Sequence, residues 1–438
     1  MKKFTILAIA ALSLAACREN EPMTGSSDFA MNAVSAADYN VTGLPVTTVS
    51  GNITSNTTWS GVIELDGIVA VKDGATLTIQ PGTFIKAKPA AVGVATGVLV
   101  IAKGGKINAV GTASQPIVFT SYNLLDNNVS TTAKPGDFGG VVLLGNAQVN
   151  TGTDMNVIEG LTDQADQKPY YYGSASSALN NESSGTMKYV RIEYAGRIIG
   201  DGNEINGLTC GGVGSGTVLE NIQVSYGADD AFEFFGGTVN AKNIIAFAQD
   251  DDGFDFDNGY TGTITNALAL ADYNSTHSLS GGKPDSNGIE LDNDATGSAN
   301  APFTQPTING LTIVGAKTST NGAKYENGIH VRRNGKLNLN DAVVTGYPVG
   351  ILLENPTSVG HVAFTNVKAH GFTLATAEKT STGTAAVTIP GVTATSTASP
   401  AVTWGMTQPF FNETFPSAWN VTPRNTGDFQ GSWTKYKF

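Results

Sequence analysis

The stretch that decides the fold reads Asp230-Ala231-Phe232-Glu233-Phe234, and a close copy follows at Asp252-Gly253-Phe254-Asp255-Phe256. Four more segments fit the same register: Asn206-Gly-Leu-Thr-Cys210, Asn287-Gly-Ile-Glu-Leu291, Asn327-Gly-Ile-His-Val331 and Val349-Gly-Ile-Leu-Leu353. Within each copy apolar positions alternate with others, which predicts a strand with one buried face. Three of the five steps between copies match a recurring unit of about 20–25 residues, which predicts stacked coils. We therefore predict an all-β fold, a right-handed parallel β-helix.

The coils are predicted to occupy residues 47–373. The two longer steps, from Gly253 to Gly288 and from Gly288 to Gly328, indicate coils with surface loops, at Asp272–Pro284 and at Asp294–Gln305 together with Lys317–Ala323. Earlier coils are indicated by strand-like runs at Gly67–Val71, Ala75–Ile79, Val98–Ala102, Lys106–Val110, Pro116–Thr120, Gly139–Leu144 and Met187–Tyr194. Frequent glycine (52 residues) and sparse charge (14%) favour short strands and turns over long helices.

The outward positions of the repeat form two predicted columns. The first holds Thr209, Glu233, Asp255, Glu290, His330 and Leu352, and the second holds Gly211, Phe235, Asp257, Asp292, Arg332 and Glu354. Neighbouring strands lie roughly 4.8 Å apart. Three acids of the first column would therefore repel one another, by roughly 3 kcal/mol for each pair at an effective dielectric near 20. A bound cation, raised pKa values or side chains turned into solvent must relieve this repulsion.

A calcium site is the first hypothesis for these acids. Ca²⁺ takes roughly 6–8 oxygen ligands from carboxylates, carbonyls and water. The candidate ligands converge on one wall and are Glu233, Asp255, Asp257, Glu290 and Asp292, and the run Asp250–Asp252 could add others. Such an ion would join the coils together or bridge to an acidic polysaccharide.

A third column has a structural interpretation. Asn206, Asp230, Asp252, Asn287 and Asn327 each stand just before a strand. Asn and Asp tolerate turn geometry and cap neighbouring backbone groups, and stacked amides hydrogen-bond along a solenoid. The glycines of the repeat mark bends where a side chain would not fit, and they are Gly207, Gly253, Gly288, Gly328 and Gly350.

The N-terminus has the pattern of a secretory signal. Residues 1–16 combine a basic start, a short apolar core and small residues, too short to span a membrane. The ending Leu14-Ala15-Ala16-Cys17 resembles a bacterial lipoprotein box, which implies lipidation at Cys17; an ordinary signal peptide is the alternative. Residues 17–46 are predicted to be a flexible tether. Its acidic beginning resembles the tag that sends Bacteroidetes lipoproteins to the cell surface.

The net charge and the cysteine content restrict which binding partners and which disulfides the chain can have. Removal of Lys2 and Lys3 lowers Lys+Arg from 25 to 23 against 37 acids, so the mature chain carries about −14. Such an excess of acids argues against nucleic acid or an anionic membrane surface as a partner. Once Cys17 is lipidated only Cys210 remains, at an inward position, so we expect a small buried apolar residue there and no disulfide within the chain.

Two segments outside the regular repeat carry aromatic residues. The polar excursion Asp154–Gly185 contains Tyr170-Tyr171-Tyr172, which could stack on sugar rings or, as we favour, pack against the wall of the helix. Residues 374–400 are either a weak last coil or a linker. Residues 401–438 recover aromatics and are predicted to cap the open end of the solenoid, with a separate aromatic-rich binding module as the alternative.

Several phrases resemble a family of Bacteroidetes cell-surface lipoproteins that has no established activity. They are Gly74-Ala-Thr-Leu-Thr-Ile-Gln-Pro-Gly-Thr83, Pro135-Gly-Asp-Phe-Gly-Gly-Val-Val-Leu-Leu-Gly-Asn-Ala147, Gly212-Val-Gly-Ser-Gly-Thr217, Gln223-Val-Ser-Tyr-Gly-Ala-Asp-Asp-Ala-Phe232, Asp292-Asn-Asp-Ala-Thr-Gly297 and Gly431-Ser-Trp-Thr434. The resemblance covers nearly the whole mature chain. It implies a β-helix held by lipid at the outer membrane and facing the cell exterior.

Catalysis on a polysaccharide is the second hypothesis. Gly227-Ala-Asp-Asp-Ala-Phe232 is similar to the double-aspartate strand of polygalacturonase-type glycosidases, although the other motifs of that family are missing. A calcium ion beside Arg332 or Arg333 would resemble a pectate lyase, with arginine as the base. If the chain is an enzyme, His330 and Arg332 are its candidate catalytic residues.

A non-catalytic role is the third hypothesis. A lipid-tethered, regular and acidic face suits an adhesin or a glycan-holding partner of an outer-membrane uptake system. A binder needs aromatic platforms, and Phe235 and Tyr260 are the outward candidates. The sequence thus leads us to expect a calcium-binding surface β-helix whose biological ligand is a glycan, with a polysaccharide lyase or glycoside hydrolase as the alternative.

Overall fold

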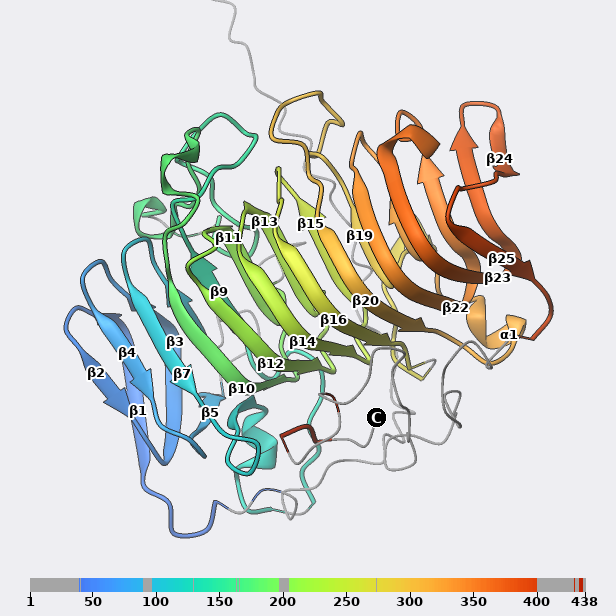
Figure 1. Ribbon diagram of the computed structural model, residues 1–438. Helices are drawn as coiled ribbons and strands as arrows, with labels where there is room; N and C mark the ends of the chain where they lie inside the picture. The colour runs from blue at the N-terminus through green and yellow to red at the C-terminus, as the bar shows by residue number, and fades with distance from the viewer. Residues whose placement is uncertain are drawn as a thin grey trace, which may run out of the picture.

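The computed structural model describes residues 39, 41–89, 97–128, 130–162, 164, 166–196, 205–272, 274–399, 429 and 433–435. In this part of the chain, 23 strands join one hydrogen-bonded sheet, whose coils lie side by side from the N-terminal to the C-terminal end (Figure 1). The pairing between successive coils is parallel throughout the six segments quoted above. The predicted parallel β-helix is therefore confirmed. The predicted signal sequence and Cys17 lie outside the described residues.

Three faces run along the solenoid. The first contains β2 (Thr57–Trp59), β4 (Thr76–Ile79), β7 (Lys106–Val110) and the first halves of β10 (Gly185–Glu193), β12 (Val218–Ser225), β14 (Asn240–Phe247), β16 (Thr263–Leu270), β20 (Thr307–Val314), β22 (Leu337–Glu354) and β23 (Val362–Thr380). The second contains β1 (Val46–Ile53), the start of β3 (Val62–Val71), β5 (Phe84–Ala87), β8 (Ile117–Thr120) and the continuation of the long strands. The third, which we call the acidic wall, contains β6 (Val98–Ile101), β9 (Gly140–Leu144), β11 (Leu208–Val213), β13 (Phe232–Gly237), β15 (Phe254–Asp257), β19 (Ile289–Leu291), β21 (Asn327–Val331) and the ends of β22 and β23.

A left-handed residue forms the corner between the first and second faces. The corner residues have φ angles between 53° and 63° and are Tyr189, Asn221, Asn243, Asn266, Asp341 and Asn366. Asn and Asp enter this conformation more readily than other side chains. Their amides also stack, because Asn243 Nδ2 donates to Asn221 Oδ1 at 2.8 Å and Asn266 Nδ2 donates to Asn243 Oδ1 at 2.9 Å. The corner is thus held by the same residue type that permits its backbone geometry.

The inward positions of the repeat fill one continuous core. Phe232 stacks on Phe254 with ring centroids 5.5 Å apart, and Phe234 stacks on Phe256 at 5.4 Å. Cys210 is fully buried among them, as predicted. The expectation that Tyr260 faces outward was wrong, because its ring stacks on those of Phe234 and Phe256 inside the coil and its hydroxyl donates to the Val239 carbonyl. Its chain position after a turn returned the side chain to the interior.

Additional elements lie outside the regular coils or close the C-terminal end. The longer steps contain the hairpin of β17 (Leu279–Ser280) and β18 (Lys283–Pro284) and the helix α1 (Ser319–Gly322). Short 3-10 helices occur at Tyr122–Leu124, Lys168–Tyr170, Ser177–Leu179 and Val359–His361. At the C-terminal end, β24 (Gly383–Ala386) pairs antiparallel with the end of β23, and β25 (Val392–Ser396) pairs parallel with an earlier part of β23.

The C-terminal region is largely outside the described residues, so its role as an end cap stays a prediction. The described Trp433 makes an edge contact with Tyr189 of β10, and Phe429 belongs to the buried cluster outside the second face. These contacts lie beside the middle coils, away from β25. Within the described part of the chain, no helix is long and apolar enough to cross a membrane.

Candidate functional site

The acidic wall carries its acids in the predicted register. Thr209 pairs with Glu233, Glu233 with Asp255, Asp255 with Glu290, and Glu290 with His330 on successive strands. The strands present these side chains outward because the alternate positions are the phenylalanines, isoleucines and leucines of the core. Sequence alternation therefore places the acids one above another along successive coils.

The column before each strand is a ladder of side-chain to backbone hydrogen bonds. The backbone N–H of Asp230 donates to Asn206 Oδ1 at 3.2 Å, and that of Asp252 donates to Asp230 Oδ1 at 2.9 Å. The N–H of Asn287 continues the ladder to Asp252, and the N–H of Asn327 continues it to Asn287 Oδ1 at 3.0 Å. The structural interpretation of this column is confirmed. Because two of its members are aspartates, the ladder also brings additional negative charge beside the acidic wall.

The C-terminal half of the wall is neutralised by arginine. Arg332 Nε lies 2.9 Å from Asp292 Oδ1, and its Nη2 donates to Glu290. Arg333 Nη1 lies 2.7 Å from Asp292 Oδ2. Glu290 and Asp292, which we call the C-terminal acid group, are thus bound by two guanidinium groups from the following coil. Two of the five predicted calcium ligands already have cationic partners.

The N-terminal half of the wall has a different environment. One carboxylate oxygen from each of Asp230, Glu233 and Asp255 lies within 4.8 Å of the others, and we call these residues the N-terminal acid group. In the described part of the chain, neither Glu233 nor Asp255 makes an ion pair with lysine or arginine. Glu233 is only 4% exposed. Its carboxylate accepts a hydrogen bond from Asn206 Nδ2.

Burial and neighbouring negative charges raise the pKa values of these carboxyl groups. Burial, together with the charges of Glu159 and Asp255, raises the pKa of Glu233 well above its usual range. Burial and the charges of Asp230 and Glu290 do the same for the pKa of Asp255. Burial and the charge of Asp292 raise the pKa of Asp257 to about 8. The N-terminal half of the wall therefore holds its negative charge only at a large electrostatic cost.

Two polar atoms in this half have no hydrogen-bond partner although they are buried: Asp255 Oδ1 and Thr209 Oγ1. Thr209 is 1% exposed and stands in the same column as the acids, one coil before Glu233. A buried polar atom without a partner normally costs about 1–3 kcal/mol. Together with three clustered carboxylates, these atoms form a set of oxygens suited to a hard cation.

The excursion 154–185 covers part of this site. Tyr172 packs over Gly211, where a Cβ atom would lie 2.7 Å from the tyrosine ring, and its ring centroid lies 6.0 Å from that of Phe235. The charges of Asp257 and Glu233, added to burial, raise the pKa of the Tyr172 hydroxyl. Packing against the wall, the interpretation we favoured for the tyrosine run, is confirmed for Tyr172.

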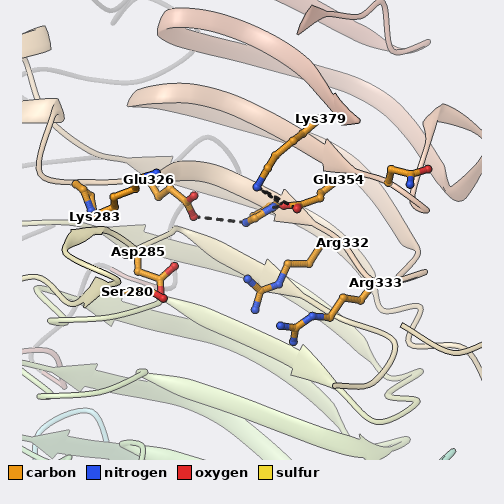
Figure 2. Close-up of a pocket in the computed structure, with 11 residues that line it drawn as sticks. Ser280, Lys283, Asp285, Glu326, Arg332, Arg333, Glu354 and Lys379 are labelled. Atoms are coloured by element: carbon orange, nitrogen blue, oxygen red, sulfur yellow. Dashed lines mark hydrogen bonds and ion pairs between the residues drawn. The ribbon is translucent and has the colours of Figure 1, made fainter. Parts of the chain in front are cut away.

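A cavity of about 260 Å³ opens beside the C-terminal acid group (Figure 2). The β17–β18 hairpin forms one side, and the other charged lining residues are Asp285, Glu326, His330, Arg332, Arg333, Glu354 and Lys379. His330 Nε2 lies 3.0 Å from Glu354 Oε2, and Lys379 Nζ lies 3.0 Å from the same carboxylate. Figure 2 shows the two arginines extending side by side in one direction. The two candidate catalytic residues, His330 and Arg332, thus share a cavity.

Sequence reasoning missed several cavity residues. Lys283 and Asp285 belong to the loop of the first longer step, and Glu326 belongs to the loop of the second. No repeat register applies to loops, so the pattern predicts no position for these side chains. Their place at the ends of the two longest insertions was the available signal, because long loops in compact domains are often functional.

Comparison with known proteins identifies the family. The family described as "Pectate-lyase like beta helix domain" matches residues 51–414. This chain belongs to that family. No curated protein shows significant similarity to it.

Two solved structures are distantly similar. The catalytic domain of a GH87 α-1,3-glucanase in complex with tetrasaccharides is 13% identical with a TM-score of 0.24, and the match covers 80% of this chain and 63% of that one. The Dettilon tailspike protein is 12% identical with a TM-score of 0.22, and the match covers 76% of this chain and 56% of that one. This chain therefore spans less than two thirds of either protein, and neither likeness bears on function.

Proposed function

We propose that this member of the pectate-lyase-like β-helix family is a lipid-anchored surface protein that binds a divalent cation and a glycan. The cation, for which calcium is the best candidate, is assigned to the N-terminal acid group of Asp230, Glu233 and Asp255. The observation that carries the proposal is the convergence of three carboxylates within 4.8 Å, where Glu233 and Asp255 make no ion pair with a described lysine or arginine.

The residues fit a calcium ion chemically. Three carboxylates and the hydroxyl of Thr209 supply hard oxygen donors, and bidentate carboxylates or water can complete the roughly 6–8 ligands that Ca²⁺ takes. Calcium tolerates irregular geometry, whereas Mg²⁺ demands a near-ideal octahedron. A bound dication would remove the like-charge repulsion that raises the pKa values of Glu233 and Asp255. It would also join β13 and β15 with the ladder residue of the preceding turn.

Catalysis by these acids is the weaker alternative. A general acid or nucleophile must reach the glycosidic oxygen or the anomeric carbon of a polymer. Glu233 is 4% exposed and Asp230 is 6% exposed, so neither carboxylate offers the surface that attack on a glycosidic bond inside a polymer requires. A single ion needs far less room. The geometry therefore favours cation binding over hydrolysis at the N-terminal acid group.

Calorimetric titration with CaCl₂ tests the cation site. Asp255→Asn keeps the shape of the side chain and removes one charge, and Asp66→Asn, in an exposed pair with Lys88, is the matched control. We expect the unaltered chain and the control to bind calcium and Asp255→Asn to bind at least about tenfold more weakly, because it loses a charged ligand. Equal affinity in all three proteins would refute the assignment.

Glycan binding rests on the family and on the sequence. The family is described as pectate-lyase-like, and the lipoprotein box at Cys17 resembles that of envelope lipoproteins. Retention of the chain on immobilised acidic and neutral polysaccharides, with calcium and with a chelator, tests this half of the proposal. A Cys17→Ser variant that still partitions with the outer membrane would count against the lipid anchor.

A further inference from the structure

We infer that the cavity of about 260 Å³ between the β17–β18 hairpin and strands β21, β22 and β23 is a subsite for one neutral, polyhydroxylated sugar unit. The inference deepens the proposed function, since it rests on glycan binding and names the chemistry of the unit that is recognised. It is separate from the cation site, whose ligands come from the preceding coils.

Basic and acidic side chains balance one another around the cavity. Five basic side chains line it, Lys283, His330, Arg332, Arg333 and Lys379, and three acidic ones, Asp285, Glu326 and Glu354. Glu290 and Asp292, which bind the two arginines, bring the acids to five. Five basic groups face five acidic groups, so the cavity offers no net charge to attract an anionic ligand.

The side chains around the cavity include both hydrogen-bond donors and hydrogen-bond acceptors. Carboxylates accept hydrogen bonds only, and ammonium and guanidinium groups donate only, whereas a hydroxyl group does both. Acceptors and donors alternate around the cavity, as in the series Glu326, His330, Glu354 and Lys379 (Figure 2). A ligand that carries a hydroxyl on nearly every carbon can satisfy both kinds of group at once. A ligand with only acceptors could bind the ammonium and guanidinium groups but could not donate to the carboxylates.

Two buried atoms of the cavity, His330 Nδ1 and Glu326 Oε2, are too far apart for a normal hydrogen bond. His330 is 2% exposed, and its Nδ1 lies 3.5 Å from Glu326 Oε2. The two atoms form a long ion pair, and neither makes a hydrogen bond of normal length. One ligand hydroxyl can accept from the imidazole N–H and donate to the carboxylate after a small movement of Glu326. Glu326 has room to move, because its side chain is 33% exposed.

The volume of the cavity limits the size of its ligand. The volume of 260 Å³ equals that of about nine liquid waters and falls just below the range of about 300–1,000 Å³ that holds drug-sized ligands. A single sugar ring fits this space, and a longer stretch of polymer does not. The described lining residues include no phenylalanine, tyrosine or tryptophan, so hydrogen bonds, and not ring stacking, would set the selectivity.

The test is a titration of the full chain, in calcium, with maltose, cellobiose and laminaribiose as neutral probes and digalacturonic acid as the acidic probe. Glu326→Gln is the main variant, because it keeps the size of the side chain and removes the charged acceptor. Lys283→Ala on the exposed hairpin is a second variant that does not depend on buried groups. Glu220→Gln, in a half-buried pair with Lys188 on the first face, is the control.

We expect at least one neutral probe to bind, Glu326→Gln to weaken it about tenfold or more, Lys283→Ala to weaken it a few-fold, and the control to leave it unchanged. Preference for digalacturonic acid overturns the inference. So does neutral-sugar binding that neither cavity variant alters, or the failure of every neutral probe. Calcium titration of the same samples separates these failures from failure of the cation site.

Discussion

The two ends of the acidic wall relieve the same electrostatic problem in different ways. At the C-terminal end, Glu290 and Asp292 are bound by Arg332 and Arg333, whose guanidinium groups come from the next coil. At the N-terminal end, Glu233 and Asp255 are equally close in register but make no ion pair with a described lysine or arginine, and their pKa values are strongly raised. The strand geometry is alike at both ends.

This difference shows that the stacking of a β-helix creates like-charge columns without deciding how they are neutralised. A guanidinium group fixed by the fold is a permanent counter-ion with five donors in a rigid fork. Carboxylates such as Glu233 and Asp255, which make no ion pair with a described lysine or arginine, can instead take up protons or a metal ion from solution. The C-terminal end is therefore closed to calcium, while the N-terminal end can respond to solution conditions.

Replacing Arg332, the permanent counter-ion of the C-terminal acid group, should have the largest effect on stability. We expect Arg332→Gln, measured in a chelator, to lower the free energy of unfolding by about 3–5 kcal/mol, the usual cost when one partner of a buried ion pair is lost. Arg332 is half-buried, with a side chain that is 19% exposed, but it contacts both acids, of which Asp292 is buried. Calcium should restore part of the loss, since the freed Glu290 lies within 4.8 Å of Asp252 and Asp255.

Chemical denaturation with and without calcium measures this effect. Lys242→Gln, in an exposed pair with Glu220, is the control and should change stability little. A loss of stability below about 1 kcal/mol for Arg332→Gln would contradict the view that this arginine neutralises the C-terminal end.

The pH dependence of stability should differ with calcium. Burial and Asp292 raise the pKa of Asp257 from 3.8 to about 8. Burial opposes the charge of His330, but contacts with Glu326 and Glu354 raise its pKa from 6.5 to about 9. Between pH 6.5 and 8 the folded chain therefore holds more protons than the unfolded chain, so stability falls as pH rises.

The size of this fall follows from the linkage. Each fully shifted group contributes about 1.4 kcal/mol per pH unit, which gives a fall of about 2–3 kcal/mol over this window in chelator. Calcium should reduce only part of this fall, because the ion competes with protons at Glu233 and Asp255, whose pKa values are also raised, while the contribution of His330 stays. Melting curves at a series of pH values check both statements, and stability that rises from pH 6.5 to 8 in chelator would contradict them.

Removing a negative charge from the N-terminal acid group should raise stability in chelator, whereas replacing Arg332 should lower it. In chelator, we expect Asp255→Asn to raise the free energy of unfolding by about 1–2 kcal/mol, because the asparagine no longer repels Glu233 and Glu290. The gain stays below the full Coulomb energy because burial and the charges of Asp230 and Glu290 already raise the pKa of Asp255, which favours its neutral form. In calcium the ranking should reverse, as the variant loses the stabilisation that the ion brings.

The fold was predictable because its signals are local and repeated. Period-2 alternation and the recurrence of one short segment indicated the coils, and the predicted register of Glu233, Asp255 and Glu290 is the one that the structure contains. The corner at Asn243 and Asn266 was missed. It depends on left-handed backbone angles inside what the pattern presents as one strand, and an isolated asparagine does not reveal that bend.

The candidate site was only half predictable. A column of acids can be read from strand register, but the pairing of Arg332 with Asp292 depends on how far a long side chain reaches across to the previous coil. The cavity depends on Lys283 and Glu326, which belong to loops that no periodicity places. Strand register therefore predicts the side of the helix on which the acids lie, and tertiary contacts decide which acids are neutralised.

The smallest predicted effect concerns the second arginine of the C-terminal end. Arg333→Gln should lower the free energy of unfolding by less than about 1 kcal/mol, because its side chain is 31% exposed and Asp292 keeps Arg332 as a partner. If both arginines neutralised the wall equally, the two glutamine variants would be similarly unstable. Side-by-side denaturation of the two variants decides between one dominant counter-ion and a shared one. The comparison also bears on the cavity, because Arg333→Gln removes a lining charge while leaving the wall folded, so its sugar binding can be measured without a large change in stability.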